Sequence, residues 1–113
     1  MNKRIKFIMA YTTINKPTDY FNTKLYTGNG STQSITGVGF QPDWIWTKGR
    51  SGARGHTLID VIRGATKTLE SSTASAEETH SNSITSINSD GFSLGNRSQG
   101  NASSETFVSW NWL

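Results

Sequence analysis

The sequence predicts an all-β fold, a single antiparallel β-sandwich of jelly-roll or lectin-like type. The first observation is composition, because the 113 residues include 15 Ser, 15 Thr, 9 Asn and 11 Gly. The side chains of Ser, Thr and Asn bond to the local backbone and compete with helix formation, and Gly weakens helices further. The second observation is a series of short alternating runs separated by turn signals. A chain of this length forms one domain with a modest core.

The first half of the chain contains three expected strands. Residues 22–26 end at a strong turn signal, Thr-Gly-Asn-Gly, and residues 33–38 end between glycines. Residues 43–48 follow a proline, which suits the start of a strand but not its interior. Alternation places both tryptophans of this strand on one face and Ile45 and Thr47 on the other.

The second half continues the pattern. Residues 56–62 indicate a strand, and residues 66–69 indicate a shorter one. Residues 83–87 and 92–94 flank an Asp-Gly step, which is a common hairpin turn. Residues 106–112 alternate again, with both of their tryptophans on one face.

The four tryptophans hold much of the apolar surface of this polar chain. We therefore expect residues 43–48 and 106–112 to meet with their indoles in the interior. The terminal strands of a sandwich often pair, so residues 24–26 are expected beside residues 106–112. Three longer segments are expected to be exposed loops on a rigid scaffold, where binding functions usually reside. These loops are residues 49–55, 71–81 and 96–105.

Several enzyme classes are excluded by the residues present, and we predict no enzyme. The chain has no cysteine, which excludes disulfides, cysteine metal sites and thiol catalysis. The histidines are His56 and His80, and no Gly-x-Ser-x-Gly motif accompanies them as a serine hydrolase would need. Glu77 and Glu78 are adjacent, so on a strand they would face opposite sides and could not flank a glycosidic bond.

No metal or cofactor is predicted. Asn88 and Asp90 carry oxygen atoms suited to calcium, but the hairpin turn explains both residues without an ion. His56 and Asp60 are four positions apart, a spacing that suits one face of a helix, whereas this segment indicates a strand.

The formal net charge of +3 is too low for a nucleic-acid partner, and the aromatic residues are not interleaved with the basic ones. No apolar run reaches about 18 residues, so membrane insertion is not expected. Arg50 and Arg54 lie on a glycine-rich loop and are candidates for contact with an anionic glycan. Trp112 is the indole expected to be most exposed and is a candidate for stacking on a sugar. Arg63 has a structural alternative, a pair with Asp60 that fixes a turn.

Five segments, taken in order, resemble a module of bacteriophage virion proteins that is common in tail fibres. They are residues 26–30, 35–46, 60–65, 88–95 and 107–110. The resemblance runs from Tyr11 to Trp112, so we expect a domain over residues 11–113 and a basic N-terminal extension over residues 1–10. Met9 is an alternative start to Met1, and this choice stays open.

The resemblance implies a concanavalin A-like or laminin G-like β-sandwich in a virion tail or other appendage. It implies no catalytic motif. The expected function is a non-enzymatic structural module that contributes to virion assembly and to attachment to a host cell-surface polysaccharide. Other virion proteins are the expected partners, and repetition on a virion favours a homo-oligomer. The alternative is a free carbohydrate-binding module or a glycan-active enzyme of the same fold.

Overall fold

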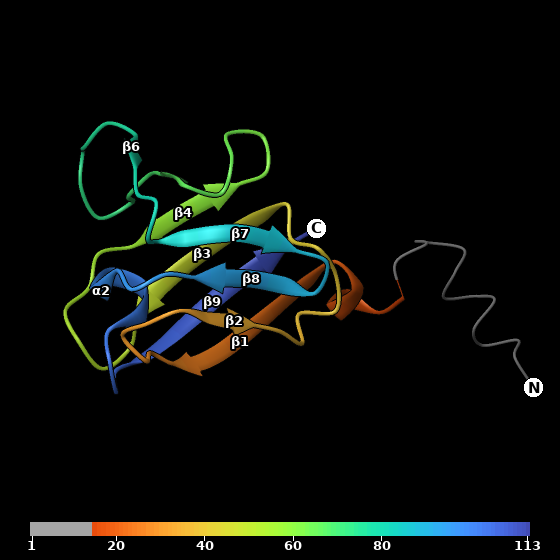
Figure 1. Ribbon diagram of the computed structural model, residues 1–113. Coiled ribbons are helices and arrows are strands. Elements are labelled where there is room, and N and C mark those ends of the chain that lie inside the picture. Colours follow the sequence, from red (N-terminus) through yellow and green to blue (C-terminus); the bar gives the residue numbers. More distant parts are fainter. Residues whose placement is uncertain (1–14) are drawn as a thin grey trace, which may run out of the picture.

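The computed structural model describes residues 15–113, which form antiparallel β-sheets in two main layers. Sheet A has the strand order β1-β9-β3-β4 and sheet B the order β2-β8-β7. Figure 1 shows sheet B lying across one face of sheet A. The strands of sheet A are β1 (Phe21–Thr27), β9 (Thr106–Trp112), β3 (Trp44–Gly49) and β4 (Thr57–Asp60). Those of sheet B are β2 (Gln33–Ile35), β8 (Gly91–Leu94) and β7 (Ile84–Asn88).

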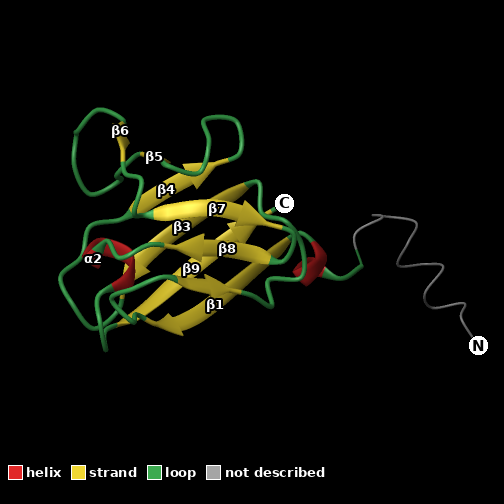
Figure 2. Cartoon of the chain, viewed as in Figure 1, coloured by secondary structure: helices red, strands yellow, loops and turns green. Residues whose placement is uncertain are grey.

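Strands dominate the described chain, as Figure 2 shows, and the prediction of an all-β fold is confirmed. The remaining pieces are a small third sheet and two short helical segments. They are β5 (Lys67–Thr68), β6 (Glu78–Thr79), η1 (Pro17–Asp19) and α2 (Ser98–Asn101). The segments expected as loops over residues 71–81 and 96–105 thus contain β6 and α2, respectively. The predicted extension over residues 1–10 and the first residues of the predicted domain lie outside the described residues.

Two predicted strands are shorter in the structure for identifiable reasons. The strand expected over residues 33–38 ends at Ile35, because Gly37 has a φ of 81° and leaves the extended conformation. The strand expected over residues 56–62 ends at Asp60, whose side chain accepts a hydrogen bond from the backbone of Arg63 and forms a turn.

The predicted hairpin is confirmed, since β7 and β8 pair with Asn88 opposite Gly91. The carboxylate of Asp90 in this turn reaches across to the loop after β2, where it accepts N–H bonds from Gly37 at 2.9 Å and Gly39 at 2.7 Å. These bonds, that of Gly37 first, lower the pKa of Asp90. The Asp-Gly turn therefore also clamps a neighbouring loop.

The last strand lies in the centre of sheet A. β9 pairs with β1, with Phe21 opposite Trp112 and Thr27 opposite Thr106. Its other edge pairs with β3. The prediction that residues 24–26 lie beside residues 106–112 is confirmed.

The core lies between the two layers and contains no tryptophan. Tyr26 of β1 stacks on Phe107 of β9 at a ring-centroid distance of 5.4 Å and meets Phe92 of β8 edge-on at 6.3 Å. The tyrosine hydroxyl donates to the carbonyl of Gly100 at 2.8 Å, and burial raises its pKa. The central buried cluster consists of Ile35, Ile45, Ile59, Ile84, Phe92 and Leu94.

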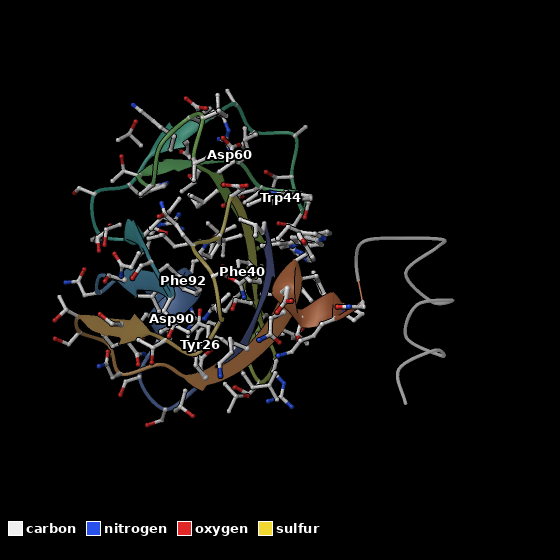
Figure 3. All side chains as sticks on the ribbon, turned by 90° about the vertical axis from the view of Figure 1, so that its right-hand side faces the viewer. Tyr26, Phe40, Trp44, Asp60, Asp90 and Phe92 are labelled. Carbon is white, nitrogen blue, oxygen red and sulfur yellow. The ribbon has the colours of Figure 1, made fainter. Side chains whose placement is uncertain are left out.

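The expectation that the tryptophans fill the core is wrong. The alternation of β3 and β9 is as predicted, but Ile45 and Phe107 point toward sheet B and the indoles point away from it. Figure 3 shows Phe92 between the layers and Trp44 on the opposite side of sheet A. Alternation shows which side chains share a face, but it does not show which face the second sheet will cover.

A buried asparagine ties the loops at one end of the layers together. Asn101 is 1% exposed, and its Oδ1 accepts bonds from the Asn29 backbone at 3.0 Å and from Gln33 Nε2 at 2.6 Å. Its Nδ2 donates to the carbonyl of Gly95 at 2.9 Å and to that of Ser31. A single side chain thus satisfies backbone groups from both layers.

Candidate functional site

Large apolar side chains cover the outer face of sheet A, which points away from sheet B. The alternation of β3 and β9 sends the tryptophans to this face, where Trp44 lies opposite Trp112 and Trp46 lies opposite Trp110. We call this surface the tryptophan face. It consists of Phe21, Leu25, Trp44, Trp46, Leu58, Leu69, Val108, Trp110 and Trp112.

The indoles of the tryptophan face lean against one another. The rings of Trp44 and Trp112 stack with centroids 4.6 Å apart and planes inclined by 25°. Trp46 meets Trp110 edge-on at 5.6 Å, and Phe21 extends the row beyond Trp112 at 5.0 Å. Such aromatic pairs contribute about 0.5–1.5 kcal/mol each beyond area burial. The indoles are still only partly buried, so the stack keeps a surface in water.

The outer face of sheet A exposes apolar side chains, although the inner face forms the core. On the outer face, Leu25 is 59% exposed and Leu69 is 38% exposed. The inner face, by contrast, carries many polar side chains. These are Asn22, Lys24, Thr47, Thr57, Ser109 and Asn111. A contiguous apolar patch on the outside of a soluble domain usually marks an interaction site.

Polar groups at the rim of the tryptophan face already have partners within the chain. The indole N–H of Trp46 donates to Nδ1 of His56 at 2.8 Å. The Nζ of Lys48 donates to the carbonyl of Gly49 at 3.0 Å. The indole N–H of Trp46 is therefore not free for a polar ligand, whereas the ammonium of Lys48 keeps further N–H donors.

A hydrogen-bonded turn lies at the rim beside Trp44. Asp60 accepts bonds from the backbone N–H of Arg63 at 2.8 Å and from its Nε at 2.7 Å. The remaining guanidinium nitrogens donate to the carbonyls of Leu58 and Lys67 at 3.1 and 3.2 Å. The backbone bond from Arg63 is the main reason that the pKa of Asp60 is lowered. The predicted structural pair is confirmed, and the turn that it fixes presents Ile62 at 91% exposure.

The residues predicted to bind a ligand fall into two separate places. Arg50 is exposed. Arg54 donates two hydrogen bonds to the carboxylate of Glu105, from Nε and from Nη2. These bonds lower the pKa of Glu105. The backbone of Arg50 bonds to Thr106 at the start of β9, and Trp112 lies six residues further along that strand. The two arginines are thus about 20 Å from Trp112 along the sheet.

Titratable groups elsewhere are held in structural contacts. Glu70 accepts a bond from Gln99 Nε2 at 2.8 Å, which lowers its pKa. His80 lies 3.3 Å from Glu78. Among residues 15–113, no group of three His, Cys, Asp or Glu side chains is placed to hold a metal ion. In the same range, no helix is both long enough and apolar enough to span a membrane.

Sequence reasoning missed the tryptophan face as a site. The sequence signal for this face is that small polar residues alternate with the tryptophans. These small residues point inward, so the tryptophans point outward. Ser109 and Asn111 are fully buried, and the Asn111 amide donates to the carbonyl of Asn22 at 3.1 Å and to Oγ of Ser109 at 3.1 Å. Phe21 and Leu69 join the face only through pairing with distant strands.

Comparison with known proteins identifies a family but no relative of known activity. Residues 16–113 match the family described as Domain of unknown function (DUF7483). No curated protein and no solved structure matches the chain. Since the match spans almost all of the described residues, the chain belongs to the DUF7483 family.

Proposed function

We propose that this chain is a non-enzymatic structural module of a bacteriophage virion, part of a tail or another appendage, and that the tryptophan face is its assembly surface. The virion role is taken from the resemblance of five segments of the sequence to virion modules. The assembly role rests on the outer face of sheet A. In the assembled particle another protein surface covers this face.

The exposed apolar outer face of sheet A is the observation that carries the assembly role. Partly exposed indoles gain about 25 cal/mol for each Å² of apolar surface that a partner removes from water. Aromatic residues are enriched at the centres of protein interfaces, where packing is dry. Because the indole N–H of Trp46 already donates to His56, a dry contact leaves this group satisfied.

The finer fold is part of the same proposal. Two antiparallel layers around a core of isoleucine and phenylalanine support a jelly-roll β-sandwich of the concanavalin A-like or laminin G-like type. In such a sandwich the sheets act as a rigid support for loops and for the outer faces. Other virion proteins are then the partners of this module.

Labelling of particles tests the virion role. An antibody raised against the recombinant chain is applied to phage particles purified from the culture that carries the gene. We expect immunogold labelling of an appendage in electron micrographs. Particles that bind an antibody against the major capsid protein but never the antibody against this chain would refute the role.

Attachment to a host glycan is a second candidate, and one observation favours it. Of the four indole N–H groups, only that of Trp46 has a hydrogen-bond partner within residues 15–113, which leaves the others as donors toward sugar hydroxyls. A glycan array distinguishes this function: selective binding that is lost in Trp112→Ala or Arg54→Ala, with the fold retained, supports it. Binding that is unchanged in both variants contradicts it, and cleavage of the polysaccharide would instead assign a glycan-active enzyme.

A further inference from the structure

The tryptophan face is negatively charged at one end. Asp60 of β4 lies opposite Trp44, beside the row in which Trp44 meets Trp112. Its carboxylate and that of Glu77 both bind the guanidinium of Arg63, at 2.7 and 3.2 Å. Two carboxylates share one guanidinium, so this cluster of three side chains carries one net negative charge.

The other end of the tryptophan face is positively charged. Lys48 lies on the same face of β3 as Trp44, four residues along the strand and therefore about 14 Å away. The exposed Arg50 follows in the same direction. Arg54 nearby is neutralised by Glu105, at side-chain exposures of 30% and 27%, and adds no net charge.

We propose that the tryptophan face is covered by the same face of a second copy of this chain, packed with the strands antiparallel. This inference rests on the proposed assembly role and names its partner. The two-fold axis lies in the plane between the two copies and runs across the strands at the middle row of the face. It places the acidic end of one copy over the basic end of the other. The parallel arrangement would instead bring like charges together.

The middle row contains side chains that would meet their own counterparts. Across the four strands these are Thr23, Trp110, Trp46 and Leu58. An isologous contact of this kind needs one self-complementary patch, which an indole block with opposite charges at its ends provides. Lys48 of each copy would then lie over the ring of Trp44 of the other, where a cation–π contact contributes.

The area of the face explains why both ends must take part. Four strands spaced by about 4.8 Å and six residues of about 3.4 Å give a flat face of about 400 Å². A stable specific interface buries about 800 Å² of accessible surface on each partner. This flat footprint already runs from the row of Asp60 to the row of Lys48, so the contact has to use the whole face together with the protruding indole surface.

Sedimentation velocity over a range of protein concentrations, combined with charge variants, tests the inference. We expect a monomer–dimer equilibrium whose dissociation constant rises at least about tenfold in Trp110→Ser and in Lys48→Glu. Ser34→Glu is the control for added negative charge, because Ser34 lies exposed on sheet B. Circular dichroism confirms that each variant is folded. A wild type that stays monomeric at every concentration, or a dimer that Trp110→Ser leaves intact, overturns the inference.

Cross-linking tests the relative orientation of the two copies. The sequence has no cysteine, so an introduced thiol is the only one that can react. Thr23→Cys places one thiol on the middle row of the face, so a short bis-maleimide reagent should link two copies at this position. Ser34→Cys is the control, since Ser34 lies exposed on sheet B. Equal linkage at both positions would refute the arrangement.

The two proposals fail in different ways. A monomeric chain that is found in labelled virions leaves the virion role standing and overturns the self-association. A dimer with the expected cross-link, from a chain that labels no particle, does the reverse.

Discussion

Neighbouring residues on β3 should respond very differently to truncation. Ile45 is fully buried between the layers, so Ile45→Ala removes core volume and is expected to lower the free energy of unfolding by about 2–5 kcal/mol. Trp46→Ala removes a far larger side chain, but from the partly exposed outer face. Its loss consists mainly of the contact with Trp110 and the bond to His56, about 1–3 kcal/mol together.

Urea denaturation followed by far-ultraviolet circular dichroism measures both free energies, because tryptophan fluorescence would itself change in one variant. The measurement is made at two protein concentrations, so that any contribution from association appears as a concentration dependence. The reasoning is refuted if, at the lower concentration, Trp46→Ala costs as much stability as Ile45→Ala. That result would place the indoles in the interior after all.

Three further predictions concern the supports of the fold. Asn101→Leu removes the hydrogen-bond partners of buried backbone groups. It should lower the free energy of unfolding, measured by urea titration, by about 3–5 kcal/mol. The exposed control Asn96→Leu should stay within about 1 kcal/mol of wild type. Equal losses would contradict the role of Asn101. Gly91→Ala should fail to fold, because a Cβ would lie 1.9 Å from the carbonyl oxygen of Ile35. The control Gly64→Ala has open space around it and should fold with only the strain of its positive φ. A cooperative thermal melt of Gly91→Ala would disprove this. Several carboxylates have a lowered pKa in the fold, so the stability that they contribute is present above about pH 4.3 and is lost as the pH falls further. They are Asp60, Glu70, Asp90 and Glu105. The midpoint of thermal unfolding should therefore fall between pH 5 and pH 3, and a constant midpoint over this range would contradict the assignment.

Most strands could be predicted from the sequence because their signals are local. The Asp90-Gly91 step and the alternation of residues 106–112 depend only on neighbouring residues, and both are confirmed. The pair of Asp60 and Arg63 is local as well, since it closes a turn of a few residues. Expectations of this kind need no knowledge of how the layers stack.

The candidate site could not be predicted, because it depends on which face of sheet A is covered. Ile45 and Trp46 are equally good core residues by composition, and the choice between them is made by the distant strand β8, which brings Phe92 against Ile45. The small inward residues Ser109 and Asn111 are buried through hydrogen bonds that a polarity pattern does not show. Short helices such as α2 are also set by tertiary contacts, here the bond from Tyr26 to Gly100.

The central position of β9 has a consequence for synthesis on the ribosome. β1 and β3 both take β9 as a partner, so neither edge is satisfied until residue 112 has been made. At about 5–20 residues per second, the nascent chain waits roughly 4 to 16 seconds between the end of β1 and the start of β9. During that time the isoleucine and indoles of β3 have no sheet partner on the side of β9. A chain that stops before residue 106 would lack the strand that joins β1 to β3 in sheet A.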